Sequence, residues 1–376
     1  MVLMSTNQTI MQNTKYIDKK KYLWLLSSLL PLLVISGVLI YQHTTQQWTI
    51  FTPLIFIYII IPLLDWVFSE DTSNPPEDSI AELESNIYYP LVTYLMIPIH
   101  YFSLIYVIDF MVNTNIPMWM FITLVFTLGI FGGLAVNLGH ELGHKKSRLD
   151  KNLAKLALAS AGYGHFNVEH NAGHHRAVAT PEDSASSRFG ENIYQFTLRE
   201  VPGGLKRAFH IEKNRLHKKS LSFWSTDNQI LHSYFMTAII YGLVTYQFGL
   251  LALLILLLHA PIVWWQLTTA NYIEHYGLLR NKDETGRYER CQPKHSWNSN
   301  HMASNLVLFH LQRHADHHAY PARHYQSLRD FPEAPQLPTG YMGMFIAAYI
   351  PPLWRKIMDP KVLKLANNNF DHINHI

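Results

Sequence analysis

Long apolar stretches separated by polar segments occupy much of the first 268 residues. Each is close to the roughly 20 residues that an α-helix needs to cross a bilayer. The pattern predicts an all-α membrane protein with six transmembrane helices, at residues 22–41, 48–68, 88–110, 118–138, 232–248 and 249–268. Only a turn around Gly249 separates the last two, so their boundary is the least defined.

The positions of lysine and arginine predict the orientation, because cytoplasmic loops are enriched in these residues. The short links 42–47 and 113–117 contain neither residue. With six spans, residues 139–231 and 269–376 both fall on the cytoplasmic side, so residues 1–376 are expected to form a single integral membrane domain with a cytoplasmic cap. The lysines before the first span, which place the N-terminus in the cytoplasm, are Lys15, Lys19, Lys20 and Lys21.

The composition supports a membrane location and excludes several other classes. Charged residues make up 15% of the chain, against roughly 25% in soluble domains. The single cysteine, Cys291, excludes a disulfide framework and a four-cysteine iron or zinc module. Electrons for any redox chemistry must therefore come from a separate carrier. The net charge of +3 is small and no nucleic-acid-binding motif is present, so no nucleic-acid partner is expected.

Histidines gather in three clusters within the predicted cap segments, with one further histidine just after the last span. The spacings are i, i+4 in HELGH, i, i+4, i+5 in HNAGHH, and i, i+3, i+4 in HADHH. Residues three or four apart share one face of a helix, so each cluster is expected to aim its imidazoles at one point. The nine candidate metal ligands are His140, His144, His170, His174, His175, His275, His314, His317 and His318.

The number of candidate ligands separates two interpretations of HELGH, residues 140–144. Alone, it fits the HExxH motif of zinc proteases, in which two histidines hold zinc and the glutamate is the base. A catalytic zinc has about three protein ligands, so nine imidazoles suit two metal ions better. Imidazole does not by itself select the metal, since zinc, copper, iron and nickel all accept it. A membrane zinc protease is kept as a remote alternative, and a metal transporter is the least favoured class.

Several other polar residues lie where they can support such a site. Metal-bound histidines usually donate their second ring N–H to a carboxylate or carbonyl, which orients the ring. His100 and His259 lie inside spans, where a polar side chain either lines a cavity or forms a helix-packing hydrogen bond. The carboxylates expected to orient ligands are Glu141, Glu169, Glu274 and Asp316.

The histidine segments resemble the signature segments of bacterial membrane-bound alkane 1-monooxygenases, the rubredoxin-dependent alkane ω-hydroxylases. The resemblance covers nearly the whole chain, from about residue 18 to 363, and NYIEHYG distinguishes this branch from other three-histidine-box enzymes. Two departures, Ser184 for proline and Tyr320 for asparagine, lie in loops beside the candidate ligands. The similar segments are HELGHK (140–145), EHNAGHHRAVATPEDSASSR (169–188), NYIEHYGL (271–278), WNSNH (297–301) and LQRHADHHAYPARHYQSLRDFP (311–332).

The resemblance implies a six-helix bundle in the bacterial inner membrane, with the active site on the cytoplasmic side. It implies that the nine histidines bind two non-haem iron ions, and that O₂ is used to hydroxylate the terminal methyl group of n-alkanes to primary alcohols. It also implies reduced rubredoxin as the electron donor, itself reduced by an NAD(P)H-dependent reductase. The alternative is a related histidine-box enzyme: a fatty acyl desaturase or hydroxylase, or a xylene-type monooxygenase.

Two further features are predicted around this site. Spans two to four are rich in Ile, Leu, Phe and Tyr and are expected to line an apolar substrate channel, with Ile57 as a candidate for limiting chain length. The basic segment 199–219 is expected either to dock the acidic rubredoxin or to meet anionic lipid headgroups. The docking candidates are Lys206, Arg207, Lys213 and Arg215.

Overall fold

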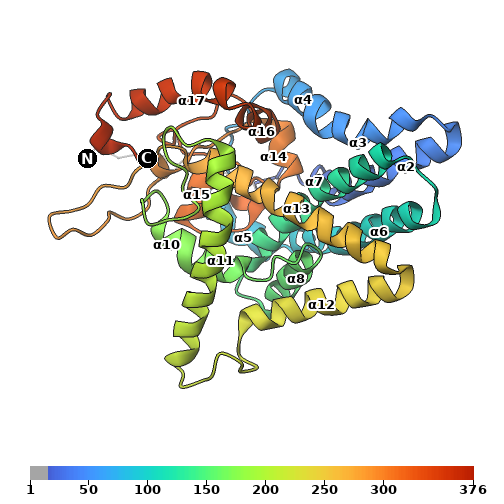
Figure 1. The fold of residues 1–376 in the computed structure, drawn as a ribbon. Coiled ribbons are helices and arrows are strands. Elements are labelled where there is room, and N and C mark those ends of the chain that lie inside the picture. Colours follow the sequence, from blue (N-terminus) through green and yellow to red (C-terminus); the bar gives the residue numbers. More distant parts are fainter. Residues whose placement is uncertain (1–15) are drawn as a thin grey trace, which may run out of the picture.

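The structure, a computed structural model, describes residues 16–376 (Figure 1). Within this range the regular elements are helices, and the only β-pairing consists of isolated bridges. The all-α prediction is therefore confirmed for these residues. Lys15, one of the four lysines used to predict the orientation, lies outside them.

Five helical segments of the described chain are long and apolar enough to cross a membrane. Each begins at or within two residues of a predicted span. Proline, which lacks a backbone N–H, accompanies the irregular turns in the first two segments: Pro31 lies in a 3₁₀ turn and Pro62 follows a π-helical turn. The segments are Trp24–Thr44 (α1 Trp24–Leu29, η1 Leu30–Leu32, α2 Leu33–Thr44), Gln47–Phe68 (η2 Gln47–Phe51, α3 Thr52–Ile55, η3 Phe56–Ile60, α4 Ile61–Phe68), α6 (Tyr88–Asn113), α7 (Met118–Gly143) and α13 (Leu250–His275).

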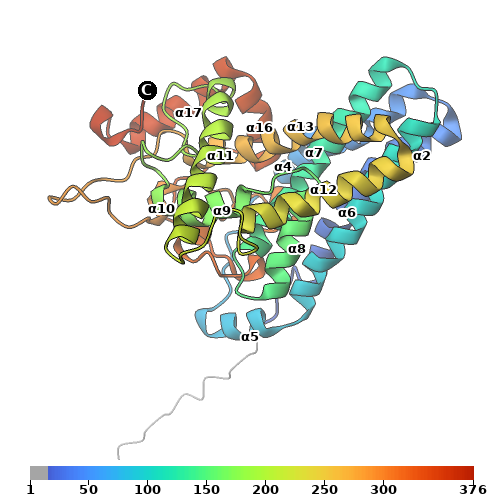
Figure 2. The same ribbon diagram turned by 60° about the horizontal axis from the view of Figure 1, so that its bottom comes forward.

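The sixth predicted span, residues 232–248, forms helix α12 (Gln229–Phe248), which packs against α13 and α8 (Arg148–Ala159) (Figure 2). Its sequence is less apolar than those of the five candidate spans, and it is not counted among them. Phe235, Leu243 and Tyr246 nevertheless face outward and are exposed. The count of six spans, the side of the membrane that the cap faces and the single-domain organisation stay predictions.

Helices α7 and α13 lie against each other and carry much of the site. Gly129, Gly132 and Gly133 of α7 face α13 so closely that an added Cβ would lie 2.4 to 2.7 Å from its side chains. Small residues of this kind let membrane helices approach one another. Both helices also continue past their predicted ends, to Gly143 and His275, because the polar residues there are buried inside the protein. This extension brings His140, near the end of α7, and His275, at the end of α13, into the same region.

The remaining segments gather around the C-terminal ends of α7 and α13 and close the site (Figures 1 and 2). Backbone hydrogen bonds join them: the N–H of Trp297 donates to the carbonyl of Glu274 at 2.8 Å, and that of Gly277 to Ser187 at 3.0 Å. These segments contain η4 (Glu77–Ser79), α5 (Ile80–Ser85), α9 (Phe166–Glu169), η5 (His170–His174), α10 (His175–Ala177), α11 (Ile193–His217), η6 (Pro293–His295), α14 (Met302–Val307), α15 (His314–Ala319), η7 (Tyr325–Ser327), α16 (Tyr341–Tyr349), α17 (Pro351–Leu365) and η8 (Phe370–His372).

Candidate metal centre

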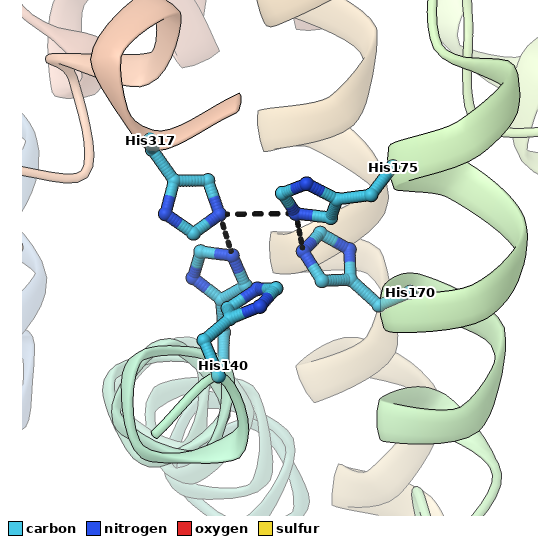
Figure 3. Close-up of side chains that lie close together, drawn as sticks. His140, His170, His175 and His317 are labelled. Carbon is cyan, nitrogen blue, oxygen red and sulfur yellow. Dashed lines mark hydrogen bonds between the residues drawn. The ribbon is translucent and has the colours of Figure 1, made fainter. Parts of the chain in front are cut away.

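The nine candidate histidines come together in two neighbouring groups, and within each group one ring nitrogen per residue lies within 4.8 Å of all the others. Figure 3 shows four members of the larger group, which point toward one another from α7, from the segment of η5 and α10, and from α15. The groups touch, since the ring centroids of His175 and His318 are 4.4 Å apart. The five-histidine group contains His140, His144, His170, His175 and His317, and the four-histidine group contains His174, His275, His314 and His318.

The second cluster divides between the groups, which its spacing did not predict. His170 and His174 are four residues apart, yet His170 belongs to the five-histidine group and His174 to the four-histidine group. Residues His170–His174 form a π-helical turn, which is wider than an α-helical turn. As a result His175, and not His174, shares the group of His170. The shared-face prediction is therefore wrong for this cluster.

The other two clusters follow the helical spacing more closely. His140 and His144, at the end of α7, share the five-histidine group. His314 and His318, four apart on α15, share the four-histidine group, whereas His317 between them belongs to the other group. The shared-face prediction is therefore wrong for His317 as well. Residues four apart meet here because the helices are regular.

The distances between ring nitrogens fit ligands that share a cation. Nε2 of His317 lies 2.9 Å from Nε2 of His140 and 3.2 Å from Nε2 of His175. In the other group, Nε2 of His314 lies 2.9 Å from Nε2 of His318. Metal–nitrogen bonds of about 2.1 Å would likewise bring neighbouring ligand nitrogens to about 3 Å. The donor set therefore fits two metal ions.

Burial prepares the histidines for metal binding. Nε2 of His144 and Nε2 of His174 are buried and have no hydrogen-bond partner within residues 16–376. Burial, reinforced by neighbouring imidazoles, holds the pKa of His170, His175 and His317 well below its usual value. These rings are therefore neutral at physiological pH, which is the form that binds a metal.

Asp183 orients one candidate ligand, and the sequence analysis missed it. Its Oδ2 lies 2.8 Å from Nδ1 of His174. Although burial disfavours the charged form of each group, their mutual attraction raises the pKa of His174 and lowers that of Asp183. Asp183 follows His174 by nine residues in an irregular loop, so no helical spacing pointed to it. The only feature of the sequence that could have pointed to Asp183 is its position within residues 169–188, one of the segments that carry the family resemblance.

Of the four carboxylates predicted to orient ligands, Glu274 is the one that contacts a candidate histidine in the described chain. Its Oε2 lies 3.2 Å from Nε2 of His314, and its Oε1 accepts a hydrogen bond from Tyr341 at 2.9 Å. The contact is to the nitrogen that faces the group, so it differs from the expected bond to the outer ring nitrogen. The other three carboxylates pair with cations: Glu141 with Lys145, Glu169 with Arg207, and Asp316 with Arg323.

The partners of Glu141 bear on the zinc-protease interpretation. In a zinc protease the glutamate of HExxH acts as the catalytic base beside the metal. Here Glu141 lies 2.9 Å from Nζ of Lys145 and accepts the backbone N–H of Tyr325 at 3.1 Å. The carboxylate is thus engaged away from the ring nitrogens, and the geometry does not support a protease.

His100 and His259 are buried in α6 and α13 and belong to neither histidine group. Nδ1 of His259 donates to the carbonyl of Leu256 at 2.7 Å, one helical turn away. That bond lies within one helix and leaves Nε2 of His259 buried without a hydrogen-bond partner among the described residues, so the role of this histidine stays open.

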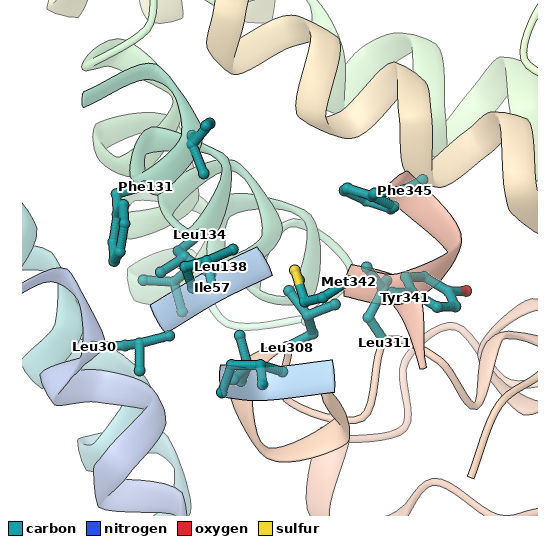
Figure 4. Close-up of a cluster of buried hydrophobic side chains, with 14 of the residues drawn as sticks. Leu30, Ile57, Phe131, Leu134, Leu138, Leu308, Leu311, Tyr341, Met342 and Phe345 are labelled. Atoms are coloured by element: carbon teal, nitrogen blue, oxygen red, sulfur yellow. The ribbon is translucent and has the colours of Figure 1, made fainter. Parts of the chain in front are cut away.

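A small apolar cavity lies between the second span, α7, α13 and α16. Figure 4 shows several of the side chains that line it. Its volume is about 40 Å³, enough for a few carbon atoms at the end of a chain. Two amides line the cavity: Asn137 donates to the carbonyl of Leu308 at 2.8 Å, and Oε1 of Gln266 accepts from the hydroxyl of Tyr58 at 3.4 Å. Residues that line the cavity include Ile57, Phe131, Leu134, Ala270, Leu311 and Phe345.

Two residues of the cavity wall lie close in sequence to candidate ligands. Asn137 precedes His140 by three residues on α7, and Leu311 precedes His314 by three residues. Ile57 of the second span also lines the cavity. Its role in limiting chain length stays a prediction.

The basic segment on α11 separates into exposed and engaged residues. Lys206 and Lys213 are exposed. Arg207 pairs with Glu169 and Asp183, and Arg215 pairs with Glu212 at 2.7 Å. Two of the four docking candidates therefore already bind carboxylates of the same chain.

Comparison with known proteins identifies the family. The fatty acid desaturase family model matches residues 117–347. The chain is 52% identical to the alkane 1-monooxygenase of Ectopseudomonas oleovorans over 362 residues, 96% of this chain and 90% of that protein. It is 50% identical to alkane 1-monooxygenase 1 of Alcanivorax borkumensis over 363 residues, 96% of this chain and 89% of that protein. The chain belongs to the alkane 1-monooxygenases.

The family predicted from the histidine segments is thereby confirmed. The alternative of a xylene-type enzyme corresponds to a more distant similarity. The hydroxylase component of a xylene/toluene monooxygenase from Pseudomonas putida is 26% identical over 283 residues, 74% of this chain and 75% of that protein. The percentage identity to the two alkane 1-monooxygenases is about twice as high, over a longer alignment.

Proposed function

We propose that this chain hydroxylates the terminal methyl group of n-alkanes to primary alcohols, with O₂ and electrons from reduced rubredoxin. The observation that carries the proposal is the convergence of nine histidines into two groups beside an apolar cavity, in a chain of the alkane 1-monooxygenases. An alkane has no polar group and no acidic proton, so acid–base catalysis has nothing to act on. The chemistry requires a strong oxidant supplied by a cofactor.

Two iron ions would be held by the five-histidine and four-histidine groups, and when bound they would supply the O₂ chemistry. The overall reaction consumes one alkane, one O₂, two electrons and two protons, and it yields one alcohol and one water. The single cysteine leaves the chain without an electron carrier of its own. This supports an external donor, for which we propose rubredoxin reduced by an NAD(P)H-dependent reductase.

The chain's own contribution is to hold the metal ligands and to present the end of the substrate. The walls of the cavity are mostly apolar. Two of its lining residues, Asn137 and Leu311, each lie three positions before a candidate ligand. A narrow apolar passage admits a linear chain end first and excludes water. This arrangement favours reaction at the terminal carbon.

The direct test is to express the chain with a rubredoxin and its reductase, supply n-alkanes of several lengths under ¹⁸O₂, and identify the products by mass spectrometry. A primary alcohol carrying one ¹⁸O atom is the expected result. A membrane-inserted protein with two irons that forms no alcohol would argue for acyl lipids or aromatics as substrates. A purified chain that holds one zinc and no iron would contradict the di-iron proposal.

Rubredoxin is proposed to dock on the exposed lysines of α11, on the cytoplasmic side of a bacterial inner membrane. Reversing charge at Lys206 and Lys213 is expected to lower rubredoxin-driven turnover several-fold and to reduce its dependence on salt, because surface charge acts mainly on association. The measurement is initial rate against rubredoxin concentration at two ionic strengths.

The matched control for docking is charge reversal at Lys364, a basic residue near the end of α17 on a different helix. It changes the net charge by the same amount per residue but leaves α11 intact. Equal loss of turnover in both variants, or no loss in either, would count against a docking site on α11.

A further inference from the structure

Arg207 points into the protein although it lies in a basic segment of α11. Its side chain is 20% exposed and it forms ion pairs with the carboxylates of Glu169 and Asp183. The distance from its Nη2 to Oδ1 of Asp183 is 2.6 Å. The neighbouring Lys206 is exposed and forms no such pair in the described chain. Arg207 is therefore a partner of two buried carboxylates, unlike the lysine beside it.

Asp183 is held in one orientation by bonds to both of its oxygens. Oδ2 accepts from Nδ1 of His174 at 2.8 Å and from Oγ of Ser186 at 2.7 Å. Oδ1 accepts from Arg207 at 2.6 Å and from the backbone N–H of Ala185 at 3.3 Å. A carboxylate has about four acceptor sites, so these four bonds leave it little freedom to rotate.

The orientation of Asp183 decides which nitrogen His174 offers to a metal. A carboxylate that is ionised can only accept, so Nδ1 of His174 carries the proton. In the form that binds a metal the lone pair then lies on Nε2, which is buried and has no hydrogen-bond partner among the described residues. His174 is a member of the four-histidine group. Outer partners of this kind fix both the tautomer and the direction of a ligand.

The sequence leaves space for the guanidinium next to the ligand. A Cβ on Gly173 would lie 2.8 Å from Nε of Arg207 and 3.1 Å from Oε1 of Glu169. Any larger residue at this position would displace the ion pair. The glycine of HNAGHH therefore suits a segment that must pass closely over Arg207.

We propose that Arg207 is a positioning residue of the metal centre. It acts through Asp183 on His174 of the four-histidine group. Through Glu169 it also holds the residue that precedes His170 of the five-histidine group. The inference rests on the proposed function, since it assumes that the two groups bind iron.

The test compares Arg207→Gln, Asp183→Asn and the double variant. Apo-protein in lipid nanodiscs is titrated anaerobically with ⁵⁷Fe(II) against a chelator, and the loaded samples are examined by Mössbauer spectroscopy. Each single variant is expected to bind one of the two irons about 10- to 100-fold more weakly and to shift its quadrupole doublet. The double variant is expected to lose no more iron affinity than the single variant that binds iron less tightly, because Arg207 acts through Asp183. Arg207→Lys should restore part of the affinity, since it keeps the charge but not the planar fork.

Arg215→Gln is the matched control, because it removes from the same helix an ion-paired arginine whose partners are Glu212 and Asp227 and not Asp183 or Glu169. It is expected to keep both irons and the wild-type spectrum. If Arg207→Gln does not insert, Gly173→Ala decides the question, because it crowds Arg207 without removing its charge; it should weaken iron binding in the same way.

Wild-type iron affinity and spectrum in Arg207→Gln, or strictly additive losses in the double variant, would overturn the inference alone. A wild-type protein that binds no iron in the same titration would overturn the proposed function and the inference together.

Discussion

Replacing His317 or His174 with alanine is expected to leave less than about 1% of alkane hydroxylation. Loss of an outer partner alone costs about 10- to 100-fold in metal affinity or activity, and loss of a ligand should cost more. His317 belongs to the five-histidine group and His174 to the four-histidine group. Each variant should therefore lose mainly the iron of its own group. Iron per chain and the ⁵⁷Fe Mössbauer spectrum measure this together with the yield of alcohol.

His217→Ala is the control for these ligand variants, because His217 is exposed at the end of α11 and belongs to neither group. It should keep both irons and near wild-type yield. If His317→Ala and His174→Ala removed the same spectral component, the division into two separate metal sites would be wrong. Retention of both irons and of turnover in either variant would exclude that histidine as a ligand.

Replacing Ile57 with tryptophan is expected to shorten the range of alkanes that the chain accepts. Ile57 is buried and lines the cavity. A tryptophan there fills space that the distal part of a long chain needs, so kcat/KM for long alkanes should fall at least about tenfold relative to short ones. One methylene in an apolar pocket already changes kcat/KM by about 10- to 200-fold. Competition between short and long alkanes, read as the ratio of the two alcohols, provides the measurement.

Ile59→Trp is the matched control for the channel. Ile59 lies two residues further along the same span but is 53% exposed, so its side chain faces away from the protein interior. The same enlargement there should leave the ratio of products unchanged. An equal shift in both variants would mean that the effect arises from a general disturbance of the second span and not from the cavity.

The fold was predictable to the extent that it depends on the local pattern of apolar residues. The five apolar spans begin at or within two residues of their predicted positions. Their C-terminal ends were less predictable, since α7 and α13 run on to Gly143 and His275 through polar residues. A polar side chain ends a span when it would meet lipid, but here the surrounding segments bury it. The sequence does not show which case applies.

The sequence by itself determined which histidines come together, because helical spacing selects eight of the nine and the family resemblance selects all nine, His275 included. Tertiary structure alone decided how they divide into five and four, because a π-helical turn at His170–His174 rotates His174 away from His170. It also decided the role of Asp183 and Arg207, whose contacts with His174 and Glu169 cross loops and helices of irregular spacing. Periodicity reports only contacts within one element. Pairings between elements depend on how the helices pack and become visible only in three dimensions.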